Sequence, residues 1–74
     1  MKSNVIIKSL LVARGLTQKD LAAMTGKVTQ SAISNAVSRG NAMKIDTFLE
    51  MVHALDAEVV VRIKGDDKSE WVID

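Results

Sequence analysis

The chain has 74 residues, about enough for one compact domain, and its 47% apolar and 26% charged residues are typical of a folded globular domain rather than a disordered one. The lack of cysteine excludes disulfides and thiolate metal sites, and a single histidine, His53, excludes a zinc-binding histidine cluster. The net charge of +1 conceals an uneven distribution, because residues 1–44 carry seven basic residues and one acid, whereas residues 45–74 carry three basic residues and eight acids. This polarity suggests that the first half of the chain meets an anionic partner.

The first predicted helix spans about residues 4–14. Apolar side chains recur there at helical spacing and predict a broad buried stripe: Val5, Ile6, Leu10 and Ala13, with Ile7 and Leu11 beside them. Gly15 is well placed to end this helix, because glycine accepts the left-handed conformation after the last turn.

The second predicted helix spans about residues 17–25 and starts at a capping motif. Thr17 is the N-cap candidate, and Asp20 lies three residues later, as in a capping box with Asp in place of Glu. The side chains expected to face the core are Leu21, Ala22 and either Met24 or Thr25. A turn that contains glycine follows: Gly26-Lys27-Val28.

The third predicted helix spans about residues 29–38, with Thr29 as its N-cap candidate. Its apolar contacts are Ile33 and Val37, one helical turn apart, and most of its other side chains are short and polar. The segment Arg39-Gly40-Asn41 is expected to end this helix.

The fourth predicted helix, about residues 44–55, has the clearest apolar periodicity: Ile45, Phe48, Leu49, Val52 and Leu55. Its cap is weak because Met43 and Lys44 are not capping residues, and Asn41 is the substitute candidate. Asp56 stands where a C-terminal glycine is customary, and aspartate tolerates the left-handed region better than most residues. We expect His53 to be half-exposed and Met24, Met43 and Met51 to pack in the core or at its rim.

After Asp56 the apolar period changes from that of a helix to that of a strand. Val59, Val61 and Ile63 alternate with other residues, and after the loop 65–69 the segment 70–74 is expected to return as a second strand, with Trp71 and Ile73 on one face. A lone two-stranded hairpin is barely stable in water, so this one must pack on its own helices or on a second chain. We favour a dimer formed through Val59, Val61, Ile63, Trp71 and Ile73.

The second and third helices with their short turn form a helix-turn-helix unit, whose second helix reads bases in the major groove of DNA. Amide and hydroxyl side chains suit that task, and the candidates for base contact are Thr29, Gln30, Ser31, Ser34 and Asn35. No acid occurs in residues 27–44, and the candidates for phosphate contact are Gln18, Lys19, Lys27, Arg39 and Lys44. Taken alone, the same polar residues are also typical of an ordinary solvated helix face.

Two segments, Leu16-Thr17-Gln18-Lys19-Asp20-Leu21-Ala22 and Val28-Thr29-Gln30-Ser31-Ala32-Ile33-Ser34-Asn35, together resemble the phage-repressor-like (Xre-type) helix-turn-helix family. The resemblance extends over about residues 5–56. It implies a mainly α, lambda-repressor-like DNA-binding domain of four helices and a sequence-specific, usually dimeric transcription regulator of prokaryotic or phage origin. In that family the glutamine after the first cap contacts phosphate, which maps to Gln18, and the exposed face of the third helix contacts bases.

This sequence departs from the family pattern at three places: an extra residue in the turn at Lys27, another near Ala36, and Asp56 in place of glycine. The two extra residues leave the register of the base-reading side chains open by about one position. The tail also differs, because many members end with a fifth helix where this chain turns to strands. We therefore divide the chain into a DNA-binding domain, residues 1–56, and a C-terminal β-hairpin for dimerisation, residues 57–74.

The functional prediction is a cytoplasmic, non-enzymatic repressor that binds double-stranded DNA as a homodimer on a palindromic operator. The alternative is a protein-binding module, either an antitoxin whose main partner is a toxin or an adaptor that has lost DNA binding. No cofactor, metal site or activated nucleophile is predicted. A membrane span is not expected either, because the longest apolar run, near residues 5–12, is short and interrupted by Lys8 and Ser9.

Overall fold

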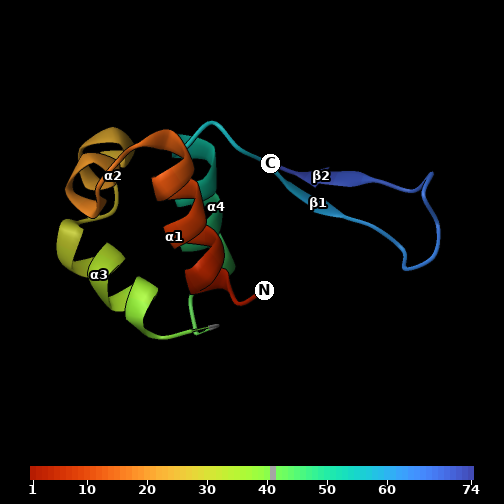
Figure 1. Cartoon of the computed structure of the whole chain (residues 1–74), viewed down its shortest axis with the longest axis horizontal. Coiled ribbons are helices and arrows are strands. Elements are labelled where there is room, and N and C mark those ends of the chain that lie inside the picture. The colour runs from red at the N-terminus through yellow and green to blue at the C-terminus, as the bar shows by residue number, and fades with distance from the viewer. Residues whose placement is uncertain (41) are drawn as a thin grey trace.

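The computed structural model describes residues 1–40 and 42–74. Within these ranges helices precede strands (Figure 1): α1 Ser3–Arg14, α2 Gln18–Thr25, α3 Gln30–Ser38, α4 Ile45–Ala54, β1 Val59–Val61 and β2 Trp71–Ile73. Each helix begins and ends within one residue of its predicted limits. The mainly helical fold with a C-terminal antiparallel hairpin is therefore confirmed.

The predicted caps form at the start of α2 and α3. The Thr17 hydroxyl accepts from the Asp20 N–H at 3.2 Å, and Asp20 Oδ2 accepts from the Thr17 N–H at 2.9 Å, which completes a capping box. The Thr29 hydroxyl accepts from the Ala32 N–H at 3.1 Å. Lys44 precedes α4 without a side-chain cap, as predicted, and Asn41, its proposed substitute, lies outside the described residues.

The capping box predicts a pH dependence of stability. The backbone N–H of Thr17 and then its side chain hold the pKa of the Asp20 carboxyl below its ordinary value. Its contribution is thus present above the unfolded-state pKa and is lost as the pH falls through the lower folded-state pKa. Urea unfolding at neutral and strongly acidic pH should show that Asp20→Ala changes the unfolding free energy more at neutral pH. Asp20→Glu should retain the pH dependence, and a pH-independent effect of Asp20→Ala would contradict this role.

All four helices contribute to one apolar core. Its fully buried side chains are Ile7, Leu21, Ile33, Met51, Val52 and Leu55, and Leu11 and Val37 adjoin them. On α1 the buried row is Ile7 and Leu11, one turn apart, whereas Val5 and Ala13 of the predicted stripe are exposed. Apolar residues surround much of α1, so periodicity alone did not identify the row that meets the other helices.

Two expectations on packing were wrong. Met24 is 51% exposed, because Leu21 and the half-buried Thr25 occupy the inner side of α2. Ile45 is 56% exposed, since it stands at the first turn of α4, beyond the reach of the core. His53 lies at the surface, and its Nε2 lies 3.3 Å from the carbonyl oxygen of Ile73, so it contacts the end of β2.

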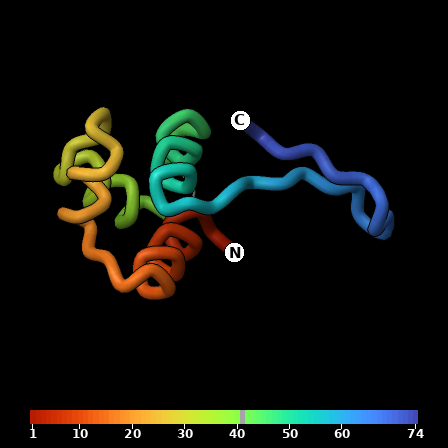
Figure 2. The backbone as a smooth tube through the Cα atoms, turned by 90° about the horizontal axis from the view of Figure 1, so that it is seen from above, coloured from red at the N-terminus to blue at the C-terminus, as the bar shows by residue number. Residues whose placement is uncertain are grey.

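The hairpin leaves the helical body after α4 and projects away from it (Figures 1 and 2). Its register pairs Val59 with Ile73 and Val61 with Trp71, which places these four side chains on one face as predicted. Ile63 lies beyond β1, because its N–H donates to the Ser69 hydroxyl at 3.2 Å instead of to a strand. The strands are therefore shorter than predicted.

Projection of the hairpin makes the protein elongated, with extents of 38 × 22 × 21 Å. The radius of gyration is 12.8 Å, whereas a compact domain of this length has about 11 Å. Val59 and Ile73 at the base are half-buried, but Val61, Ile63, Trp71 and Val72 are each half or more exposed. The helices of the same chain thus cover only the base of the hairpin. The exposed apolar side chains beyond the base are consistent with the prediction that the hairpin needs a covering surface.

Candidate nucleic-acid interface

Helix α3 separates an apolar row from a polar row. Ile33 and Val37 point into the core with 0% and 3% exposure, and the exposed polar side chains of this helix are Gln30, Ser31, Ser34, Asn35 and Ser38. Among these, the Ser38 hydroxyl donates to the Asn35 carbonyl oxygen at 3.0 Å within the helix. The other four are the predicted base-reading residues of α3, and together they form its exposed, uncharged polar face.

Thr29 differs from the other predicted base-reading residues. It is exposed, but its hydroxyl oxygen accepts from the Ala32 N–H, so it also holds the start of α3. Its hydroxyl proton stays available for a further acceptor. Thr29 therefore lies at the N-terminal edge of the polar face, where its hydroxyl oxygen also caps α3.

Thr25, which was predicted only as a candidate core-facing residue, holds the turn between α2 and α3. The Thr25 hydroxyl lies 3.1 Å from the Ala22 carbonyl oxygen and 3.3 Å from that of Val28, and it accepts from the Val28 N–H at 3.3 Å. Gly26 takes the left-handed conformation, with φ 64°, so the chain turns directly after α2. Lys27 is accommodated in this turn and is exposed.

The predicted phosphate contacts lie at the start of α2, in the turn before α3 and at the C-terminal end of α3. Gln18 is half-buried at the start of α2, next to the exposed Lys19. Lys27 carries its ammonium 3.5 Å from Glu50 Oε1 on α4, an exposed ion pair of the kind that contributes little to stability. Lys27 is thus partly neutralised by an acid far along the sequence, which its acid-free sequence neighbourhood did not reveal.

Arg39 and Lys44 lie together beyond the C-terminal end of α3. With Asn35 and Thr47 they line a hollow of about 310 Å³ between the C-terminal half of α3 and the start of α4. Between Leu21 and Lys44 the described residues include no acid. The hollow therefore combines two cations with the amide of a predicted base-reading residue.

Two residues at the start of α1 hold the C-terminal end of α3, and the sequence analysis gave them no role. Asn4 Nδ2 donates to the Val37 carbonyl oxygen at 3.0 Å, and the Ser3 hydroxyl donates to that of Gly40 at 2.9 Å. The backbone N–H of Asn4 also donates to the Gly40 carbonyl oxygen at 3.3 Å. These partners lie more than thirty residues away, so no local sequence signal exists for them.

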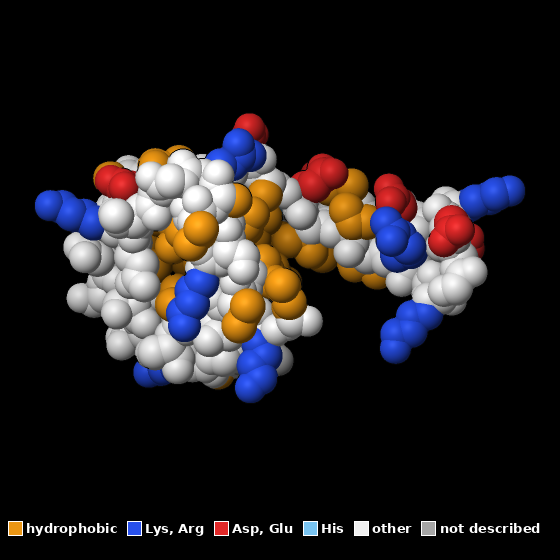
Figure 3. Space-filling model, viewed as in Figure 1, with side chains coloured by type: hydrophobic (Ala, Val, Ile, Leu, Met, Phe, Trp, Pro, Cys, Tyr) orange, Lys and Arg blue, Asp and Glu red, His pale blue; other side chains and the backbone are white. Residues whose placement is uncertain are grey.

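Charge is distributed along the long axis of the molecule. Figure 3 shows acidic side chains mostly over the hairpin and its junction, while the helical body is mainly uncharged with scattered Lys and Arg. Figure 1 places α3 at the opposite end of the molecule from the hairpin. A polyanion that approaches α3 therefore meets few acids, because most of them lie at the far end.

Metal-ligating clusters and membrane-spanning helices are absent from the described part of the chain. No group of three or more His, Cys, Asp or Glu side chains in residues 1–40 and 42–74 is placed to hold a metal ion. Over the same residues, every helix is too short or too polar to cross a membrane.

Comparison with known proteins agrees with this geometry. A family model described as "Helix-turn-helix" matches residues 7–60, which include most of α1, all of α2, α3 and α4, and the start of β1. Comparisons with curated proteins and with solved structures give no match.

Proposed function

Because the chain belongs to the phage-repressor-like (Xre-type) helix-turn-helix family, a family of DNA-binding transcription regulators, we propose that it is a repressor that binds a palindromic operator as a homodimer. The observation that carries this proposal is the exposed, uncharged polar face of α3: Gln30, Ser31, Ser34 and Asn35. Repression is steric, since a protein on the operator excludes RNA polymerase or another regulator.

Helix α3 enters the major groove and reads bases in this proposal. Gln30 and Asn35 each have an amide that bonds adenine at two positions, and Ser31 and Ser34 donate or accept at either kind of base pair. Thr29 contacts DNA at the edge of this face, where its hydroxyl proton is available. The packing of Ile33 and Val37 beneath supports these roles, because it keeps the polar face turned outward.

The phosphate backbone is held on both sides of α3. Gln18 and Lys19 contact it from the start of α2, Lys27 from the turn, and Arg39 and Lys44 from the hollow beside Asn35. Contact by Lys27 requires exchange of Glu50 for phosphate, which is inexpensive for an exposed pair at 3.5 Å. Residues 57–74 serve as the dimerisation element, and residues 1–56 as the DNA-binding domain.

The test begins with selection of a preferred duplex from a random-sequence library by the purified protein. Fluorescence anisotropy then compares this duplex with a scrambled copy at about 50 and 200 mM salt. We expect the preferred duplex to stay bound at the higher salt and the scrambled copy to dissociate. No enrichment, or equal binding that salt removes, would contradict sequence-specific regulation and favour a protein-binding module.

The backbone contacts make a separate prediction. The double variant Arg39→Ala/Lys44→Ala should weaken binding to preferred and scrambled duplexes alike, because phosphates carry no sequence information. Removal of one phosphate-binding cation should lower the slope of log affinity against log salt by about 0.9.

Lys64→Ala/Lys68→Ala is the matched control, since it removes the same charge from the hairpin, at the far end of the molecule. This control should leave the salt slope within error of the unmodified protein. An equal reduction of the slope in both double variants would show that only net charge matters and would remove Arg39 and Lys44 from the interface.

A further inference from the structure

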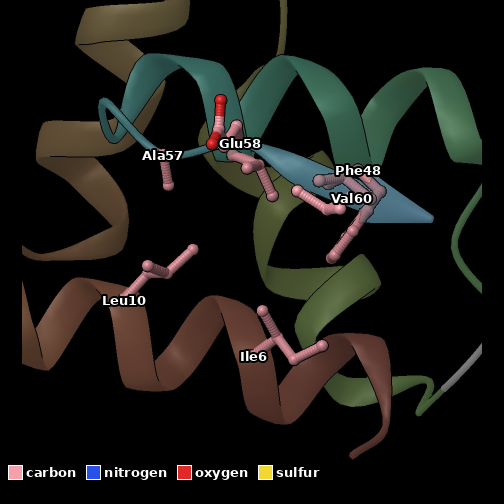
Figure 4. A pocket seen from close by; sticks show the side chains of 8 residues that line it. Ile6, Leu10, Phe48, Ala57, Glu58 and Val60 are labelled. Carbon is pink, nitrogen blue, oxygen red and sulfur yellow. The ribbon is translucent and has the colours of Figure 1, made fainter. Parts of the chain in front are cut away.

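An apolar pocket of about 280 Å³ lies between the helical body and the base of the hairpin. Figure 4 shows Ile6 and Leu10 on α1 directed toward Phe48 of α4 and Val60 of β1, with Ala57 at one end. Among the described side chains that line the pocket, Glu58 alone is charged. An apolar cavity of about 150 Å³ already admits a benzene molecule, so this pocket is large enough for an aromatic side chain.

The chain itself carries an aromatic side chain in need of cover. Trp71 is the single tryptophan of the sequence, and it is 56% exposed on the projecting hairpin. Val61 lies opposite Trp71 across the strand pair and is 50% exposed. Tryptophan is enriched among residues that anchor protein interfaces, and an isolated two-stranded hairpin is marginal in water.

Charge favours a second copy of this chain as the occupant. Residues 1–16 carry three basic residues and no acid, and of these Arg14 already donates to the carbonyl oxygens of Leu55 and Asp56, whereas residues 57–74 carry five acids and three basic residues. The hairpin of one copy is therefore attracted to the α1 side of another, and a two-fold axis repeats the same contact in reverse. Figure 3 shows apolar side chains exposed in the notch between the helical body and the hairpin, where such an arm would lie.

The length of the molecule favours overlapping arms over arms that meet at their tips. Each protomer is 38 Å long, with α3 at one end and the hairpin at the other (Figure 1). Dimers joined only at the hairpin tips would place the two α3 helices at opposite ends of a particle twice as long. Arms that lie on the partner's helical body bring the reading helices closer, toward the roughly 34 Å that separates successive turns of a major groove.

We propose that Trp71 of a second copy fills the pocket between α1, α4 and the hairpin base, and that the two copies exchange this contact reciprocally. The proposal rests on the homodimer of the proposed function and specifies its interface. Trp71 is the anchor, Ile6, Leu10 and Phe48 form the walls, and Ala57 lies at the edge of the pocket.

The single tryptophan makes the proposal directly measurable. Indole emission moves to shorter wavelength when the ring leaves water, so the emission maximum of the full chain should shift on concentration. Sedimentation velocity over the same range should give a monomer–dimer transition with the same midpoint. Both measurements are made without DNA, so they do not depend on operator binding.

Ala57→Phe tests the pocket without removal of the probe. The phenylalanine fills the space in cis, so the emission maximum should stay that of an exposed indole and dimer affinity should fall. Val12→Phe adds the same side chain at a position on α1 that is 82% exposed and outside the pocket, and it should behave as the unmodified protein. Trp71→Ala should weaken the dimer roughly 30-fold or more, as expected for a buried tryptophan anchor.

Each alternative outcome identifies which part of the proposal is wrong. A monomer–dimer transition across which the Trp71 emission maximum does not change would overturn the pocket contact and leave the homodimer standing. An unchanged dimer in Ala57→Phe would do the same. A monomer at every concentration would overturn both the pocket contact and the homodimer, while sequence-specific DNA binding would still be decided by the duplex selection.

Discussion

Replacement of both Gln30 and Asn35 by alanine is expected to reduce affinity for the preferred duplex roughly 100-fold or more and to leave affinity for random DNA unchanged. A good bidentate amide–adenine pair is worth about 1–3 kcal/mol of discrimination, and 1.4 kcal/mol corresponds to a factor of ten in affinity. The double variant removes two such contacts from each half-site. Random DNA is held through phosphates, which these neutral side chains do not bind by charge.

Anisotropy with preferred and scrambled duplexes measures this effect. Both residues are exposed, so the variant should keep the thermal unfolding midpoint of the unmodified protein. Ser9→Ala is the control, because Ser9 is an exposed polar residue on α1, outside the helix-turn-helix unit. Equal losses on preferred and random DNA would refute base reading by Gln30 and Asn35 and assign them to the backbone instead.

Ile33→Ala is expected to lower the free energy of unfolding by about 2–5 kcal/mol. Ile33 is 0% exposed and belongs to the same core cluster as Leu21 and Met51, so the truncation leaves a cavity where three helices meet. A domain of this size has a marginal reserve of stability, so this loss is a large fraction of the total. The polar face of α3 would lose its support together with the core.

Urea unfolding followed by far-ultraviolet circular dichroism measures this second effect. Val12→Ala is the control, because Val12 is an aliphatic residue on α1 that is 82% exposed, and its truncation should change stability by less than about 0.5 kcal/mol. Equal effects of the two variants would contradict the assignment of Ile33 to the core. A stable Ile33→Ala that still lost DNA affinity would show that Ile33 positions the polar face of α3 without contributing to global stability.

Local chemistry made much of the fold predictable. The caps at Thr17 and Thr29 are short-range hydrogen bonds between residues three apart, and such bonds can be inferred from residue type and spacing alone. Asp56 takes the left-handed conformation with φ 56°, as its place after α4 predicted. The alternation of apolar residues after Asp56 predicted the hairpin, with Trp71 and Ile73 on one face, and the structure pairs Trp71 with Val61.

Prediction was weaker where several helix faces are apolar. Residues 5–13 of α1 offer more than one apolar stripe, and the row that is buried depends on where α3 and α4 lie. Met51 is fully buried, in agreement with the expectation that it packs in the core or at its rim, but the apolar stripe assigned to α4 did not include it, because α4 packs on more than one neighbour. The sequence of a single helix does not show how many other helices will pack against it.

In the candidate interface, too, some features could be predicted from the sequence and others could not. The types and spacing of Gln30, Ser34 and Asn35 indicated a base-reading face from the sequence, and the structure places all three on the exposed side of α3. The hydrogen bond from Asn4 to the end of α3 and the ion pair between Lys27 and Glu50 were not predictable. Both join residues more than twenty positions apart, and such partners meet only when the helices pack.

By itself, the sequence determined the helix limits, their caps, the polar face of α3 and the change to strands after Asp56, because these depend on interactions among residues close in the chain. The tertiary structure decided which row of α1 is buried, which cations already have a partner and where the hairpin points. It also created the pocket lined by Ile6, Leu10 and Phe48, since that pocket exists only where α1, α4 and the hairpin base come together. These features depend on contacts between distant segments, whose geometry no local pattern encodes.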